Sequence, residues 1–346
     1  MSNDLNQDLD LVIGLDAGGT RTRVVLAAAH DGRPLGEGAA GPGNALTVPV
    51  PRLTAHLAEA IATAVPERAR GNVVAVAGGF AGATAASPDD PGHVNARSAL
   101  TAALARLGVP PGPVTVCSDI EAAFAAAPGT PADGLALVAG TGAVALRVAD
   151  RRATVTVDGD GWLLGDDGSG FWIGRSAVRA GLRMADGRGP ATALAAAVGR
   201  ALGLPGEVLP YATATATATA TDGAAWARPH REAYRRHLLP AVMADAPIRL
   251  ARLAPLVAEA AAERDAVAEA ILDEAANQLA DTVRALEPRP GERIVATGGL
   301  LGPDGPLTTR LTPRLKAFGA TLDWVADGSR GAVALARLLA HGGEAR

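Results

Sequence analysis

Glycine turns that carry Asp or Thr follow apolar segments at several points in this sequence. The first is LVIGL followed by DAGGT, which contains Asp16, and the second is LALVAG followed by a Thr-Gly pair. The third, RIVATGGLLG, spans 293–302. Glycines let backbone N–H groups come close to phosphate oxygens, and a threonine hydroxyl adds a donor. These turns predict a phosphate site, and a carboxylate such as Asp16 beside phosphates indicates a cation, for which a largely water-coordinated magnesium ion is suitable.

One glycine turn on its own is more often a plain hairpin. Three of them, each after an apolar segment, argue against coincidence, because ligands of α/β sheets bind beyond the carboxyl ends of the strands. The chain has one lysine, Lys316, which follows no glycine-rich loop. A P-loop lysine is therefore excluded, and any bound ATP must be held without one.

Composition limits the class of protein. The 346 residues favour two domains, with 48% hydrophobic residues and a formal net charge of −4. The sequence has no stripe of basic residues, which is the pattern that would indicate a nucleic-acid partner. The single cysteine, Cys117, excludes an intrachain disulfide and a multi-cysteine zinc site. The sequence shows neither a signal-peptide pattern nor an apolar run of membrane-spanning length, so we expect a cytoplasmic protein without a membrane partner.

Strand and helix patterns surround the turns. In the first half, apolar periodicity predicts strands over 11–15, 21–29, 34–41 and 113–119, a strand that runs into a glycine-rich turn over 72–83, and helices over 51–65 and 95–107. A helix over 120–127 leads to a second set, with strands over 135–140 and 143–148, a strand and glycine turn over 293–302, and helices over 177–203, 252–286 and 331–340. Asp265 is the expected N-cap that divides 252–286 into two helices. The second set repeats the opening strand–turn–strand unit, which predicts two similar α/β halves with a cleft between them.

Four segments resemble a known superfamily. DAGGTRTRVVL looks like the first phosphate motif of the sugar kinase–heat shock–actin superfamily, GTGAVALRV like its second, and VATGGLLG like its adenosine motif. LLGDDGSGFWIGRSAV closely resembles a stretch of N-acetylglucosamine kinases and of the related BadF/BadG/BcrA/BcrD ATPase family. The resemblance covers nearly the whole chain and is least clear over 205–250.

This resemblance implies an α/β fold of two actin-like (ribonuclease H-like) lobes, with mixed sheets flanked by helices and an interlobe cleft. The N-terminal lobe would span 1–119. The C-terminal lobe would span 120–346 and contain a helical insertion over about 177–290. The closing helix over 331–340 would pack back on the N-terminal lobe. The resemblance also implies ATP and Mg²⁺ as cofactors, an amino sugar as the second substrate, and a homodimer.

Carried over by position, the resemblance assigns roles to particular residues. Asp119, in VCSDIEAAF, matches the catalytic aspartate, a general base that accepts the proton of a sugar hydroxyl. Asp166, in GDDGSG, matches a sugar-binding aspartate, and Asn44 falls where a sugar-contacting asparagine is placed. Asp16 would hold Mg²⁺ through water. The other predicted contacts are, for ATP, Gly18, Gly19, Thr20, Gly140, Thr141, Gly142, Gly298 and Gly299 and, for the sugar, Gly78, Gly79, Gly159 and Asp160.

Plainer interpretations stand beside two of these residues. Asp119 could only cap a helix, and Asn44 could only be a turn residue in GPGNA. Glu121, two residues after Asp119, is expected to face solvent. GEGAAG over 36–41 formally matches a dinucleotide fingerprint, but it follows a hairpin and opens no helix.

Two departures from the family pattern bear on the substrate. Ala143 follows GTG, where the eukaryotic enzyme resembles GTGS and has one more hydroxyl. Asp160 lies in GDGW, where the family has GGWG, so that an extra carboxylate could pair with a free amine. We therefore expect a kinase that transfers the γ-phosphate to the 6-hydroxyl of N-acetylglucosamine, with glucosamine as the alternative acceptor.

Two other classes of function are weighed against this one. A BadF-type activator of electron transfer holds an iron–sulfur cluster with two cysteines per subunit, and Cys117 alone argues against it. A sugar sensor without catalysis is disfavoured because Asp16 and Asp119 are retained. The Thr-Ala repeat over 211–222 is a surface loop or, less readily, a strand.

Overall fold

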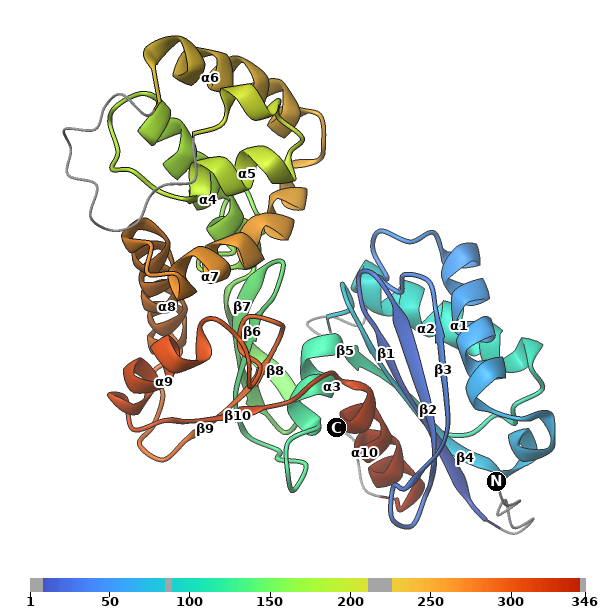
Figure 1. Cartoon of the computed structure of the whole chain (residues 1–346). Helices are drawn as coiled ribbons and strands as arrows, with labels where there is room; N and C mark the ends of the chain where they lie inside the picture. Colours follow the sequence, from blue (N-terminus) through green and yellow to red (C-terminus); the bar gives the residue numbers. More distant parts are fainter. Residues whose placement is uncertain (1–8, 85–88, 211–225, 343–346) are drawn as a thin grey trace.

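The computed structural model describes residues 9–84, 89–210 and 226–342, which form two lobes (Figure 1). The Thr-Ala repeat over 211–222 lies outside the described residues. The N-terminal lobe contains the strands of one sheet, and the C-terminal lobe contains those of a second sheet and an all-helical part.

A five-stranded mixed sheet forms the centre of the N-terminal lobe, in the order β3-β2-β1-β4-β5. Its strands are β1 (Leu11–Ala17), β2 (Thr22–Ala28), β3 (Pro34–Ala40), β4 (Val73–Phe80) and β5 (Val114–Ser118). The first three strands are antiparallel neighbours, whereas β4 and β5 run parallel to β1. All seven residues of β1 are buried, because helices cover both faces of the sheet.

Two helices pack on one face of this sheet, and two on the other. The first pair is α1 (Val50–Ala64) and α2 (Pro91–Arg106), with the short 3₁₀ segment η1 (Glu67–Asn72) between them in sequence. The second pair is α3 (Asp119–Ala125) and α10 (Ser329–Ala340), which bury small side chains against the sheet. The strand and helix segments predicted for this half are thus confirmed, with end points shifted by a few residues.

The glycines of GEGAAG have a packing role. Gly36 and Gly38 lie in β3, where α1 crosses closely above the strand. A Cβ atom at Gly36 would lie 2.2 Å from the carbonyl oxygen of Ala64, and one at Gly38 would lie 2.1 Å from that of Ala60. Only glycine permits this approach of helix to strand, so the match to a dinucleotide fingerprint has no nucleotide-binding meaning.

The C-terminal lobe repeats the same sheet topology. Its order is β10-β9-β6-β7-β8, and its strands are β6 (Gly134–Ala139), β7 (Ala143–Ala149), β8 (Arg152–Asp158), β9 (Arg293–Thr297) and β10 (Thr321–Trp324). Strands β6, β7 and β8 form the antiparallel meander, and β9 and β10 run parallel to β6. The expectation of two similar actin-like halves is therefore confirmed. The edge strands β8 and β10 were not predicted, because β8 is mostly exposed and β10 has four residues.

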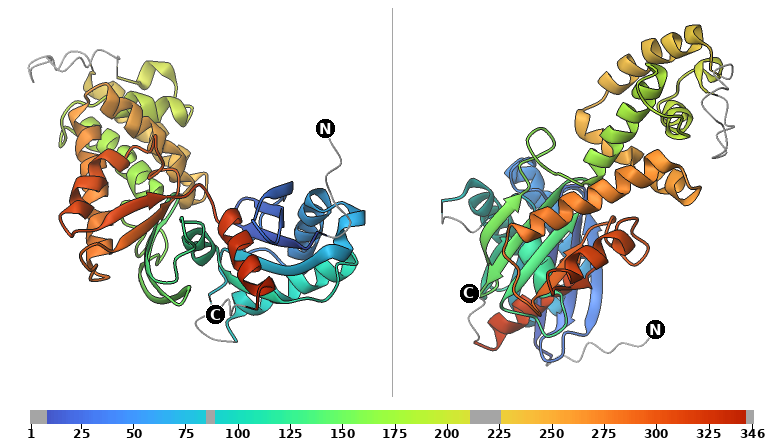
Figure 2. Two further views of the ribbon diagram at one scale, coloured as in Figure 1. Left: turned by 90° about the horizontal axis from the view of Figure 1, so that it is seen from below. Right: turned by 90° about the vertical axis from the view of Figure 1, so that its left-hand side faces the viewer.

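Helices α4 to α9 pack on the C-terminal sheet and beyond it. They are α4 (Gly170–Ala185), α5 (Leu194–Ala201), α6 (Arg228–Met243), α7 (Ala254–Ala262), α8 (Ala266–Arg284) and α9 (Thr308–Lys316), with 3₁₀ segments η2 (Gly206–Val208) and η3 (Pro247–Leu253). Helices α4, α5 and α6 group together above the C-terminal sheet in the view of Figure 1, and Figure 2 shows the same group from two other sides. Asp265 caps α8 as predicted, since its carboxylate accepts from the N–H groups of Val267 and Ala268.

Helices α3 and α10 join the two lobes. Helix α3 buries Ala122 and Ala125 with the N-terminal sheet, and it buries Ala123 and Phe124 against the C-terminal sheet. Helix α10 comes from the end of the described chain but lies on β1, where a Cβ atom at Gly14 would be 2.4 Å from the backbone nitrogen of Val333.

Candidate active site

A cavity of about 980 Å³ brings the three glycine turns together. Thr20 reaches it from the β1–β2 turn of the N-terminal lobe, Thr141 from the β6–β7 turn, and Gly299 from the turn after β9. The rest of its lining comes mainly from η3, α7 and the start of α4, with residues Gly140, Gly170, Ile248, Arg249, Ala251, Arg252, Ala254, Pro255, Ala258, Glu259, Leu300 and Pro306. The cavity is mainly apolar, and the glycine turns at its edge could bind phosphates. Both features are suitable for a nucleotide.

Each turn has a backbone reason for its glycines. In the first, the N–H of Gly18 donates to the carbonyl of Arg21 (3.0 Å), and Gly19 stands exposed at the tip. In the second, the N–H of Gly140 donates to the carbonyl of Gly142 (2.9 Å). In the third, Gly298 has a φ of +103°. The predicted ATP contacts thus lie in the cavity wall or in the turns that form it.

Gly298 and Gly299 differ in what surrounds them. A Cβ atom at Gly298 would lie 2.2 Å from the carbonyl oxygen of Ala139, whereas one at Gly299 would meet no atom within 4 Å. Gly299 therefore faces open space in the cavity, and Gly298 is required by the fold of the turn.

Asp16 is part of a strand and not of the turn that its motif suggested, because β1 continues through Ala17. Its side chain is buried, and burial, followed by the negative charges of Asp119 and Asp327, raises its pKa to about 6. The Arg23 guanidinium, 3.5 Å away, and the N–H of Gly328 at the start of α10 act in the opposite direction. Asp16 is therefore a carboxylate whose charge is only partly balanced by the protein.

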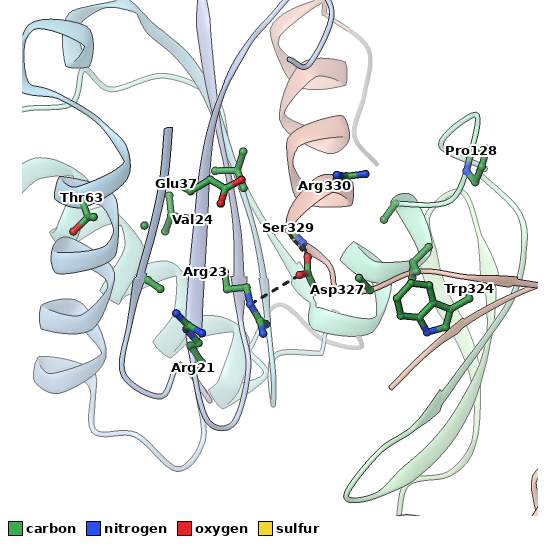
Figure 3. A pocket seen from close by; sticks show the side chains of 16 residues that line it. Arg21, Arg23, Val24, Glu37, Thr63, Pro128, Trp324, Asp327, Ser329 and Arg330 are labelled. Atoms are coloured by element: carbon green, nitrogen blue, oxygen red, sulfur yellow. Dashed lines mark hydrogen bonds and ion pairs between the residues drawn. The ribbon is translucent and has the colours of Figure 1, made fainter. Parts of the chain in front are cut away.

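Arg23 was not selected from the sequence. It lies directly opposite Asp16 on β2 and reaches toward both Asp16 and Asp327, the latter at 3.9 Å. Figure 3 shows it in an interlobe groove of about 840 Å³ together with Trp324 and Arg330. Alternation along β2 places Arg23 on the same face as Asp16, and this signal was available in the sequence.

Asp119 is the first residue of α3, and Ser118 is the N-cap of that helix. Burial raises the pKa of Asp119, and the charge of Glu121 adds to this, whereas backbone N–H groups at the helix start lower it. Gly79 on β4 packs against the same turn, because a Cβ atom there would lie 2.4 Å from Cβ of Ala122 and 3.2 Å from Cα of Asp119. The neighbouring Gly78 is buried, and its carbonyl accepts from the thiol of Cys117.

The loop between β8 and α4 contains three of the predicted sugar residues, Gly159, Asp160 and Asp166. Asp158, which was not predicted, has a φ of +62°, and its carboxylate accepts from the N–H groups of Gly159 (2.7 Å), Asp166 (2.6 Å) and Asp167 (2.9 Å). Asp160 is exposed at the tip of this loop. The Asp158 carboxylate thus connects the beginning of the loop to its end. The sequence did not predict this role, because an acidic residue after an exposed strand is a weak signal.

Asp166 and Asn44 have contacts of their own. Asp166 is buried, with a φ of +57°, and its pKa is raised by burial and by the charges of Asp158 and Asp160. The side-chain oxygen of Asn44 accepts from the N–H groups of Leu46 (2.9 Å) and Thr47 (3.0 Å). The side-chain oxygen of Asn44 therefore accepts hydrogen bonds within its own turn after β3.

Comparison with known proteins now adds to this geometry. The family model of the BadF/BadG/BcrA/BcrD ATPase family matches residues 13–310. The chain belongs to the BadF/BadG/BcrA/BcrD ATPase family. No curated protein matches the sequence.

Solved structures share the fold of this ATPase. The candidate N-acetylglucosamine kinase of Chromobacterium violaceum is 22% identical with a TM-score of 0.68, and that of Porphyromonas gingivalis is 18% identical with a TM-score of 0.64; each alignment covers 96% of this chain and 99% of the other. The ROK family glucokinase of Streptomyces griseus is 21% identical with a TM-score of 0.50, covering 94% and 99%. The predicted family is therefore confirmed, and the chain shares its fold with these solved structures.

One prediction about this ATPase is wrong. Glu121 does not face solvent, since it is 2% exposed. The helix pattern over 120–127 gave no indication of a second lobe packed on the outer side of α3, and that lobe is what buries the side chain. Within the part of the chain that the structure describes, no helix has the length and apolarity needed to cross a membrane.

Proposed function

We propose that this ATPase is an amino-sugar kinase that transfers the γ-phosphate of ATP to the 6-hydroxyl of N-acetylglucosamine. One observation carries the proposal: Asp16 on β1 pairs with Gly79 on β4, and a Cβ atom at Gly79 would lie only 3.2 Å from Cα of Asp119 at the start of α3. Asp16 is in the strand that leads to Thr20 and the nucleotide cavity. The base and the phosphate turn are therefore neighbours.

Asp119 would act as general base in this reaction. Its carboxylate accepts the proton of the 6-hydroxyl while that oxygen attacks the γ-phosphorus and the bond to the β-phosphate oxygen breaks. A raised pKa makes the carboxylate a better acceptor near neutral pH. The hydroxyls of Thr20 and Thr141 would donate to phosphate oxygens, and the open space at Gly299 would admit the adenosine. Positioning and charge compensation supply most of the catalysis in phosphoryl transfer.

The magnesium ion that such a reaction needs fits the residues present. Asp16 could hold a hydrated Mg²⁺ through its waters, and the ion would supply charge neutralisation at the phosphates. The unbalanced charge of Asp16 is consistent with this role.

The sugar would lie between the Asp119 turn and the Asp158–Gly168 loop, with Asp166 accepting from ring hydroxyls. The exposed carboxylate of Asp160 favours a second candidate substrate, glucosamine, whose ammonium group it could pair with. N-Acetylglucosamine and glucosamine differ only in whether this amine is acetylated. The charge on Asp160 is therefore the feature of the site that could distinguish them.

A coupled ADP-release assay tests the function. N-Acetylglucosamine, glucosamine, N-acetylmuramic acid, N-acetylmannosamine and glucose are compared, and the 6-deoxy analogue of N-acetylglucosamine is the control. We expect the highest kcat/KM with N-acetylglucosamine and no phosphorylation of the 6-deoxy analogue. ATP hydrolysis without turnover of any sugar would instead favour the activator, and the absence of any ATP turnover would favour the sensor.

A further inference from the structure

Glu121 makes contacts in both lobes. One carboxylate oxygen, Oε2, accepts from the backbone N–H of Ser118 (2.8 Å) and from its hydroxyl (3.2 Å). The other, Oε1, accepts from the backbone N–H of Ala153 (2.8 Å) on β8. Ser118 belongs to the N-terminal sheet and Ala153 to an edge strand of the C-terminal sheet. This one buried side chain therefore connects the two sheets directly.

The first turn of α3 is held tightly on its N-terminal side. Besides Gly79, two glycines of the α10 region lie against it. A Cβ atom at Gly328 would be 3.1 Å from Cβ of Ala122, and one at Gly331 would be 1.8 Å from the carbonyl oxygen of Ala122. With no free volume between these backbones, the turn that carries Asp119 must move together with β4 and α10.

The contact with Ala153 is different in kind. It joins this rigid unit to β8 of the C-terminal lobe through a charge-assisted hydrogen bond that begins two residues after Asp119, whereas the other contacts of α3 with that lobe, made by Ala123 and Phe124, are apolar. Buried hydrogen bonds to a carboxylate are stronger than neutral ones and fix direction. A rotation of the C-terminal lobe must therefore either carry the Glu121 carboxylate with it or break this bond.

We propose that Glu121 is a positioning residue that couples the orientation of the C-terminal lobe to the first turn of α3, so that Asp119 reaches its catalytic position when the lobes close. The inference rests on the proposed kinase function for its catalytic meaning. Glu121 does not touch the reacting atoms; it acts through Ser118 and the helix start. Closure that completes a catalytic site is common in two-lobed enzymes.

Two variants separate this role from simple helix capping. Glu121→Gln keeps the shape, but its amide nitrogen cannot accept, so at least one donor loses its partner. Glu121→Asp keeps the charge and can still cap Ser118, but it is one methylene too short to reach Ala153 as well. We expect both variants to lower kcat by about 10- to 100-fold, with KM values for sugar and ATP within about threefold of wild type.

Asp265→Asn is the matched control. The Asp265 carboxylate also ties two segments together, since it caps α8 and accepts from the N–H of Ala193 (2.7 Å), but it lies outside the candidate site. We expect this variant to melt at a lower temperature with an unchanged kcat. If Glu121→Asp turns over like wild type, capping suffices and the coupling role is wrong. An equal loss of kcat in Asp265→Asn would show a general effect of stability and would also overturn it.

Small-angle X-ray scattering separates a failure of this inference from a failure of the proposed function. With a non-hydrolysable ATP analogue and Mg²⁺, wild type and Asp265→Asn should contract, and Glu121→Gln should keep a larger radius of gyration. This readout needs no sugar. If wild type phosphorylates no sugar, the kinase proposal fails while the coupling is still measured. The same contraction in Glu121→Gln would overturn the coupling whatever the substrate is.

Discussion

The backbone N–H of Ala143 donates a 3.1 Å hydrogen bond to Oδ1 of Asp166, which joins the candidate sugar loop to the candidate phosphate turn. Ala143 follows Thr141 and Gly142, and a Cβ atom at Gly142 would lie 2.8 Å from the same oxygen. The two halves of the candidate active site are therefore in contact before any substrate binds. A sugar that donates a hydrogen bond to the Asp166 carboxylate should therefore also affect the turn that faces the phosphates.

Asp158 offers a test of the sugar loop. Asp158→Asn keeps a residue that tolerates the positive φ, but it leaves at least one of three backbone N–H groups without an acceptor. We expect a loss of about 1–3 kcal/mol in stability and a rise of about tenfold or more in the KM for sugar. Thermal unfolding and steady-state kinetics measure the two effects. Asp167→Asn, which changes an exposed neighbour, is the control, and an unchanged KM in Asp158→Asn would place the sugar elsewhere.

Replacement of Asp119 tests the catalytic base. Asp119→Asn should lower kcat by about 10²- to 10⁴-fold because the amide cannot accept the hydroxyl proton. Calorimetry should still show sugar and ATP binding within a few-fold of wild type, since the shape of the site is kept. Near-normal turnover would contradict the assignment and leave Asp119 as the first residue of a capped helix only.

Asp16 predicts a pH dependence of stability. Its folded-state pKa of about 6 lies above the ordinary 3.8, so the folded protein binds this proton more tightly than the unfolded chain. The associated stability is complete below 3.8 and is lost as the pH rises through about 6. Asp16→Asn removes the cost of the buried charge, and we expect it to raise stability at pH 7 by up to about 3 kcal/mol while abolishing kinase activity.

Denaturant unfolding at several pH values measures this effect. The advantage of Asp16→Asn over wild type should vanish at low pH and be constant above pH 7. If Asp16 holds the hydrated ion, saturating Mg²⁺ and ATP should stabilise wild type and so reduce the stability advantage of Asp16→Asn, because a ligand that binds only the folded protein stabilises that protein. A variant less stable than wild type at pH 7 would show that the bond to Arg23 outweighs the cost of burial.

Two adjacent glycines separate nucleotide binding from folding. Gly299→Val places a side chain in open cavity space, and we expect a KM for ATP raised about tenfold or more with little change in melting temperature. Gly298→Ala meets the carbonyl oxygen of Ala139 at a strained φ, and a loss of about 1–3 kcal/mol in stability is expected. The opposite pattern, with Gly299→Val unstable and ATP affinity retained, would place the adenosine outside this cavity.

The sequence was informative where one residue type has one use. Glycines beside Thr20, Thr141 and Gly299 indicated a nucleotide site, and these three residues line one cavity. It was less informative where a role depends on a partner far along the chain. Nothing near Glu121 specifies the N–H of Ala153, and nothing near Arg23 specifies Asp327. Such pairs depend on how two lobes pack, and neither periodicity nor local motif encodes that packing.

Helix α10 also constrains how the protein is made. It fills one face of the N-terminal sheet, where Ala332 and Ala336 are buried with Val12, Ala75 and Ala77. On a translating ribosome β4 emerges some 250 residues, and β1 some 310 residues, before the helix that covers them. The apolar face must therefore stay open, or be shielded by a chaperone, until α10 has been synthesised. Premature termination within α10 would leave this face exposed and prone to aggregation, even though every candidate active-site residue had already been translated.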